Sequence, residues 1–219
     1  KFSRTNLLTV GSQILYLVSD ITAAIKTYNE HTSFVLSVAF SHDGALIASG
    51  SQDNSIKIRQ TLTGTVVKTL TAHANPVPAV AFSKNGLYFA SGGYDNKIRF
   101  WDTSSWTSIR IMTGHTAAIY SLAFSANSQY LVSGSSDYKI KIWNTATGAL
   151  INTLSGHTNL VRAVDVSPID GSIVSCSCDA LIKLWDSNGN FIKTLSGHTD
   201  CVTSVAFSSD GKYIVSGSS

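Results

Sequence analysis

Histidine, serine and aspartate recur along this chain at fixed intervals, and these three residue types can together perform nucleophilic catalysis. Five of the six histidines are spaced by 42, 42, 42 and 41 residues: His31, His73, His115, His157 and His198. A serine lies 18 residues after each of them, and an aspartate lies four residues after the first four serines: Ser49, Ser91, Ser133, Ser175 and Ser216, with Asp53, Asp95, Asp137 and Asp179. A serine activated by a histidine that an aspartate orients is the arrangement of many hydrolases.

The repetition argues against catalysis, because one active centre needs one such set and this chain carries at least three complete sets at equal spacing. The chain also lacks the Gly-x-Ser-x-Gly turn that exposes the serine nucleophile of many hydrolases. Sequence motifs for phosphate-binding loops, zinc proteases and calcium loops are absent as well. We therefore predict an architectural role for the repeated residues, and no catalytic residue, metal ligand or cofactor.

Each period predicts four short strands separated by turn residues, and together they would hold the repeated residues in place. In the first full period these strands fall at residues 34–41, 46–51, 55–58 and 65–70, with apolar and polar residues alternating in the third. Six residues after the aspartate comes Trp101, Trp143 or Trp185, but the first full period has Arg59 there. No segment shows a helical period, so the fold class is all-β.

The composition of the 219 residues excludes several classes of protein. Apolar residues make up 43% of the chain, which is enough for a core and excludes a disordered protein. The net charge of +3, without clusters of Lys or Arg, argues against dedicated nucleic-acid binding. No apolar run approaches the roughly 18 residues of a membrane helix, so we predict no membrane span.

A four-stranded unit of about 42 residues with Gly-His and Trp-Asp pairs resembles the WD-repeat β-propeller family. The pairs that carry the resemblance are Gly114-His115, Gly156-His157, Gly197-His198, Trp101-Asp102 and Trp185-Asp186, with Trp143-Asn144 close to them. The resemblance implies blades around a central channel: a partial degenerate blade at 1–30, blades at 31–72, 73–114, 115–156 and 157–197, and a partial blade at 198–219. In the first of these, Leu8–Ser12 is expected to form a second strand.

The resemblance also implies a buried hydrogen-bond network in each regular blade. Its members would be His73, Ser91, Asp95 and Trp101; His115, Ser133, Asp137 and Trp143; and His157, Ser175, Asp179 and Trp185. An indole donates, a carboxylate accepts, and a hydroxyl and an imidazole do both, so such a chain satisfies each polar group. The blade at 31–72 has Arg59 instead of tryptophan, which predicts either a weaker blade or a contact surface.

The positions that differ between repeats predict the binding surface. The residue four after each histidine is always Val or Ile and is expected in the core, so its two neighbours face the other way. In the family these neighbours, and the residue before each turn aspartate, line the face where partner proteins bind. The resulting candidate set is Phe34, Leu36, Gln52, Pro76, Pro78, Tyr94, Tyr120, Leu160 and Arg162.

Cysteines and repeated bases predict less. Cys176, Cys178 and Cys201 are odd in number, which argues against a disulfide framework and favours free thiols in an intracellular, most simply cytoplasmic, protein. The position four residues after each repeated aspartate always carries a basic side chain, which we expect to be exposed to solvent: Lys57, Arg99, Lys141 and Lys183.

We predict a non-catalytic scaffold that assembles other proteins into a complex through its loop and strand-start rim. One alternative is a recognition module of a larger regulatory protein, such as a ubiquitin-ligase substrate receptor or the sensor of a regulatory ATPase. Another is an enzyme using the central channel, for which the out-of-phase His42 is poor support.

Because the repeats begin and end within a blade, we expect a segment of a larger ring, seven-bladed by the family's habit, whose other strands come from the remainder of its own chain. The rival is a short protein whose open ends pair with a copy or a partner.

Overall fold

The structure is a computed structural model, and it describes residues 15–20 and 23–219. The described residues form twenty β-strands joined by turns. Within these two ranges no helix is long and apolar enough to cross a membrane. The strand predicted at Leu8–Ser12 lies outside the described residues.

The strands pair in chain order into antiparallel sheets. The first sheet is a hairpin of β1 (Leu15–Asp20) and β2 (Ala23–Tyr28), and the last is a hairpin of β19 (Val202–Phe207) and β20 (Ile214–Ser218). Between them lie four sheets of four strands each.

The first of the four sheets contains β3 (Val35–Phe40), β4 (Leu46–Ser51), β5 (Ile56–Gln60) and β6 (Val66–Leu70). The second contains β7 (Ala79–Phe82), β8 (Tyr88–Gly92), β9 (Ile98–Asp102) and β10 (Ser108–Met112). The third contains β11 (Ile119–Phe124), β12 (Tyr130–Ser135), β13 (Lys139–Asn144) and β14 (Leu150–Ser155). The fourth contains β15 (Val161–Val166), β16 (Ile173–Ser177), β17 (Ile182–Trp185) and β18 (Phe191–Leu195).

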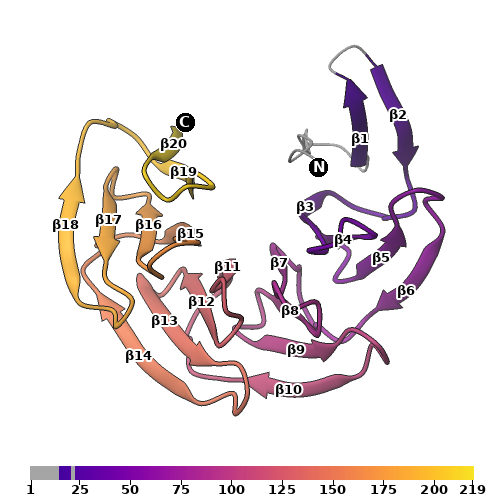
Figure 1. The fold of residues 1–219 in the computed structure, drawn as a ribbon, viewed down its shortest axis with the longest axis horizontal. Coiled ribbons are helices and arrows are strands. Elements are labelled where there is room, and N and C mark those ends of the chain that lie inside the picture. Colours follow the sequence, from indigo (N-terminus) through magenta and orange to yellow (C-terminus); the bar gives the residue numbers. More distant parts are fainter. Residues whose placement is uncertain (1–14, 21–22) are drawn as a thin grey trace.

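The sheets follow one another around an open arc, with the first strand of each sheet innermost and the fourth outermost (Figure 1). The β1–β2 hairpin lies at one end of the arc and the β19–β20 hairpin at the other, and the ring does not close. The all-β prediction of propeller blades is confirmed. The blade boundaries and a total of seven blades stay predictions.

The core lies between successive blades. The apolar position four residues after each histidine is buried in all five repeats, at Val35, Val77, Ile119, Val161 and Val202. On the second strand of the four larger sheets, a small apolar residue is at most 1% exposed because the next blade covers it: Ala48, Ala90, Val132 and Val174. At the corresponding place in β20, Val215 is 68% exposed. Burial of this position therefore depends on a following blade.

Candidate functional site

A chain of hydrogen bonds runs through each regular blade. In the blade of residues 115–156, His115 Nδ1 lies 2.8 Å from Asp137 Oδ2, and His115 Nε2 lies 2.7 Å from Ser133 Oγ. The Trp143 indole N–H donates to the same Ser133 oxygen over 2.8 Å. The hydroxyl of Ser133 is then free to donate to Nε2, while Nδ1–H donates to the carboxylate, so every group has a partner when the imidazole is neutral.

The same contacts occur in the blades of residues 73–114 and 157–197. The histidine–aspartate, histidine–serine and tryptophan–serine distances all lie between 2.8 and 3.0 Å, and they join His73, Asp95, Ser91 and Trp101, and His157, Asp179, Ser175 and Trp185. The structure thus brings together all twelve residues of the predicted network.

Burial sets the charge states in these networks. Burial lowers the pKa of His73 and His157 below its usual value, although Asp95 and Asp179 oppose that shift. For Asp137, burial acts to raise the pKa, but hydrogen bonds from His115 and from backbone N–H groups outweigh it and lower the pKa to about 2. A neutral histidine beside an ionised aspartate is the protonation state that the hydrogen-bond pattern requires.

The serines of the network are placed for packing and not for attack on a substrate. Ser91, Ser133 and Ser175 are each 0% exposed, and each oxygen already accepts an indole N–H. A nucleophile must reach the substrate within hydrogen-bond distance. These hydroxyl groups are sealed between strands, which supports the architectural interpretation.

The blade of residues 31–72 uses a different solution at the tryptophan position. Arg59 is 1% exposed, and its two terminal nitrogens donate to the two carboxylate oxygens of Glu30 over 2.9 and 2.7 Å. Its guanidinium also lies 4.7 Å from the centre of the Tyr28 ring. The expectation of a contact surface at Arg59 is therefore wrong, because the side chain is buried in an ion pair.

In the blades with tryptophan at this position, the residue before the histidine is small: Ala72, Gly114 and Gly156. A Cβ atom on Gly114 would lie 3.1 Å from the Trp143 ring, and one on Gly156 would lie 3.2 Å from the Trp185 ring. Where arginine replaces the ring, the corresponding residue is Glu30, which binds that arginine. The two substitutions in this blade are thus chemically coupled.

The predicted partner-binding residues lie where each first strand begins and each second strand ends. Phe34, Leu36, Gln52 and Tyr94 are exposed, while Pro76, Tyr120, Leu160 and Arg162 are half-buried. Backbone hydrogen bonds hold these residues in pairs: the N–H of Gln52 donates to Phe34, that of Tyr94 to Pro76, and that of Cys178 to Leu160. The prediction that Pro78 belongs to this surface is wrong, because the residue is buried. It lies next to the β7 strand, which packs against the preceding blade.

Three of these side chains stack across three consecutive blades. The Tyr94 and Tyr120 rings meet edge to face with centres 5.5 Å apart, and the Arg162 guanidinium lies 4.7 Å over the Tyr120 ring. Burial and a hydrogen bond with Tyr120 raise the pKa of Tyr94 to about 12. The rim therefore presents an ordered aromatic and cationic row whose order the sequence pattern did not reveal.

Two expectations about cysteines and bases are corrected. Cys178 and Cys201 form a disulfide, because they occupy rim positions of consecutive blades; Cys176 stays unpaired and buried. Lys141 and Lys183 are buried and not solvated, and their ammonium groups donate to Thr153 and Thr194 on the outer strands.

Sequence reasoning missed Asp165 on the innermost strand β15. The other blades have alanine at this phased position, namely Ala39, Ala81, Ala123 and Ala206. The Asp165 carboxylate accepts the Phe207 backbone N–H of the next blade over 2.8 Å. The replacement of alanine by aspartate in this one repeat could have drawn attention to the residue. The Asp165 side chain links two consecutive blades through this hydrogen bond.

The arc of four-stranded blades and the repeated buried networks define a WD-repeat protein. The model of the WD40 family ("WD domain, G-beta repeat") matches residues 23–59, 64–102, 106–144, 148–186 and 189–219, and the chain belongs to this family. Repeats of this family serve as platforms for interactions between proteins.

Among proteins of known role, the chain is similar to the vegetative incompatibility protein HET-E-1 of Podospora anserina. The two are 48% identical over 54 residues, which are 25% of this chain and 4% of that protein. The chain thus matches a small part of a much longer relative.

Proposed function

We propose that this chain is a non-catalytic platform that gathers other proteins into a complex through the rim formed by Phe34, Leu36, Gln52, Pro76, Tyr94, Tyr120, Leu160 and Arg162. The stacked row of Tyr94, Tyr120 and Arg162 is the observation that carries the proposal. Aromatic residues and arginine are the usual anchors of protein interfaces. Because this row is held by contacts across three blades, little side-chain freedom is lost when a partner binds.

The rim is also ordered by the backbone beneath it. The paired hydrogen bonds between first-strand starts and second-strand ends fix these side chains on rigid strands. Exposed Phe34 and Leu36 extend the apolar part of the surface, and Phe34 is 50% exposed. Exposed apolar groups beside polar ones are typical of binding sites.

The test is a pull-down with the double variant Tyr120→Ala, Leu160→Asp. We expect it to lose its partners, because the variant removes the centre of the stacked row and puts a charge on the apolar rim. The matched control is Ile111→Ala with Ile151→Asp, which alters exposed residues of the outer strands β10 and β14. Unchanged binding by a folded rim variant would refute the proposal.

A second candidate is a recognition module within a larger regulatory protein, such as a ubiquitin-ligase substrate receptor or the sensor of a regulatory ATPase. It is favoured by the length of HET-E-1, of which the matched 54 residues are only 4%. The intact mass of the native polypeptide separates the two: a mass near 23 kDa supports the platform alone.

The cytoplasmic location stays a prediction, and the Cys178–Cys201 bond removes the argument for it from free cysteines.

A further inference from the structure

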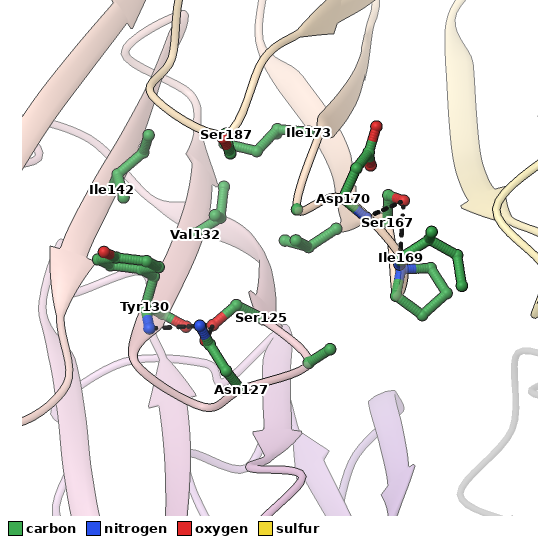
Figure 2. A pocket seen from close by; sticks show the side chains of 14 residues that line it. Ser125, Asn127, Tyr130, Val132, Ile142, Ser167, Ile169, Asp170, Ile173 and Ser187 are labelled. Carbon is green, nitrogen blue, oxygen red and sulfur yellow. Dashed lines mark hydrogen bonds between the residues drawn. The ribbon is translucent and has the colours of Figure 1, made fainter.

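A hollow of about 350 Å³ lies between the third and fourth large sheets, at the end of the strands opposite the rim. Figure 2 shows the Val132, Ile142 and Tyr130 side chains on one side and Ile173 and the 167–170 turn on the other. Val132, Ile142 and Ile173 form an apolar base that is buried, and the exposed apolar side chains at the hollow are Tyr130 and Ile169. Its volume falls in the range of about 300–1,000 Å³ that is usual for ligand pockets.

The corresponding place between the first and second large sheets is filled by the protein itself. The Trp106 indole is buried there, with its ring centre 6.3 Å from Phe82 and 5.9 Å from Phe89. Trp106 is presented by the turn between β9 and β10 and packs in the same cluster as Ile58 and Leu46 of the preceding blade. An aromatic side chain carried on a turn thus closes this junction.

The junction between the second and third large sheets is filled by aromatic rings as well. The Phe100 ring centre lies 4.9 Å from Tyr88 and 5.8 Å from Phe124. Phe100 stands 42 residues after Ile58, and Phe124 stands 42 residues after Phe82. Aromatic side chains therefore pack both of these consecutive junctions, in different combinations.

At the third junction the same phased positions carry smaller residues. Val166 stands where the other two blades have Phe82 and Phe124, and Ile142 stands where the preceding blade has Phe100. Trp185 pairs with Phe191 across residues 186–190, which is one residue fewer than the 102–107 segment between the paired Trp101 and Ser108, and the left-handed residue of this turn is Gly189. The hollow thus lies at the junction whose phased positions lack these aromatic rings.

We infer that this hollow binds the aromatic side chain of a partner protein, with an indole as the best fit. The occupant is indicated by Trp106, which fills the equivalent junction from a neighbouring turn. The exposed side chains of Asn127, Asp170 and Ser187 line the mouth. Asp170 accepts two hydrogen bonds from Ser172, and a carboxylate has about four acceptor sites, so it can also accept an indole N–H.

This site is separate from the rim, since turns at the other end of the strands form it. It would give the platform a second recognition surface whose existence does not depend on the proposed function. Binding there covers the exposed apolar surface of Tyr130 and Ile169 with a ring, and burial of such surface is the main source of affinity for aromatic anchors.

The experiment uses the whole chain with isotope-labelled isoleucine methyl groups and two blocked tripeptides, Gly-Trp-Gly and Gly-Leu-Gly. We expect the tryptophan peptide to shift the methyl signals of Ile142 and Ile173 and to leave Ile47 and Ile58 unchanged. The leucine peptide should shift none of them. No shift with the tryptophan peptide, or equal shifts with both peptides, would overturn the inference.

Two variants locate the site. Val166→Phe copies Phe82 and Phe124, and should abolish the shifts by filling the hollow; if this variant fails to fold, Ile142→Phe copies Phe100 and serves instead. Trp106→Gly removes the plug of the first junction, and should make the Ile58 methyl signal respond to the tryptophan peptide. Shifts that persist in the filled variant would contradict the site.

Discussion

In the blade of residues 157–197 the Trp185 indole donates to Ser175, whereas in the blade of residues 31–72 the Arg59 guanidinium lies at the same phased position and binds Glu30. Both side chains are at most 2% exposed. In both blades the histidine still bridges its serine and aspartate, at His157 and at His31. The histidine–serine–aspartate part of the network is therefore the same in both blades, whereas the tryptophan–serine bond of one is replaced by an ion pair in the other.

The difference teaches that the residue before the histidine and the residue at the tryptophan position form one unit. A ring leaves room for only a small residue beside it: Ala72 precedes the histidine of the Trp101 blade, and a Cβ on Gly156 would lie 3.2 Å from Trp185. A buried arginine needs a counter-charge, which Glu30 provides. The buried arginine and its glutamate therefore form a pair, so exchanging one alone should be costly and exchanging both should be tolerated.

The largest expected effect comes from Trp185→Arg. This variant buries a cation with no partner beside Gly156, and we expect a loss of about 4 kcal/mol of unfolding free energy, or about 8–16 °C in Tm. Adding Gly156→Glu should recover more than half of that loss, because it recreates the pair of Glu30 and Arg59. Chemical denaturation of the single and double variants measures both quantities.

The reverse exchange, which puts tryptophan and glycine into the blade of residues 31–72, tests the same coupling in the other direction. Arg59→Trp alone leaves Glu30 against a ring and should destabilise the protein, while Arg59→Trp with Glu30→Gly should restore stability. A double variant no more stable than its single parent, in either blade, would show that the two positions are independent.

A smaller effect is expected from His115→Ala in a regular blade. The variant leaves Ser133 and Asp137 without their shared partner, which should cost about 2 kcal/mol and lower Tm by about 4–8 °C. The neighbouring Thr116→Ala is the matched control, since its side chain is exposed and its backbone N–H to Asp137 remains. If His115→Ala matched the control, the buried-network interpretation would fail.

The smallest expected effect is on pH. Burial lowers the pKa of His31, His73 and His157, with their aspartates opposing it. The unfolded chain therefore takes up protons below the ordinary histidine pKa of about 6.5 while the folded chain does not, so stability is fully present above that pH and is lost as pH falls. From about pH 7.5 to about pH 6.5 the three histidines together should cost up to about 1 kcal/mol. Urea midpoints at the two pH values measure it, and a midpoint that rises on acidification would mean that these histidines are charged in the folded state.

Much of the fold followed from spacing. Period, strand number and the apolar position after each histidine are local properties of every repeat, so the strands and the buried Val77 or Ile119 could be predicted directly. The network residues could also be named, because the resemblance to the family implies them and their donor and acceptor types match in every regular blade.

Contacts between repeats could not be predicted in this way. The bond between Cys178 and Cys201 and the burial of Pro78 depend on which residues meet across a three-dimensional junction. The same holds for the hollow beside Val166, which is visible only when three junctions are compared. A repeat pattern describes what blades share, and these features arise where blades differ.

The contacts that hold the β19–β20 hairpin carry a consequence for local opening of the arc. In a repeat array each unit is stabilised mainly by its neighbours. The β19–β20 hairpin is fastened to the preceding blade by the Asp165–Phe207 hydrogen bond and by the Cys178–Cys201 bond. Amide exchange in this hairpin should therefore respond to reducing agent while exchange in β11–β14 does not, so the redox state of one cysteine pair sets how often the hairpin opens away from the arc.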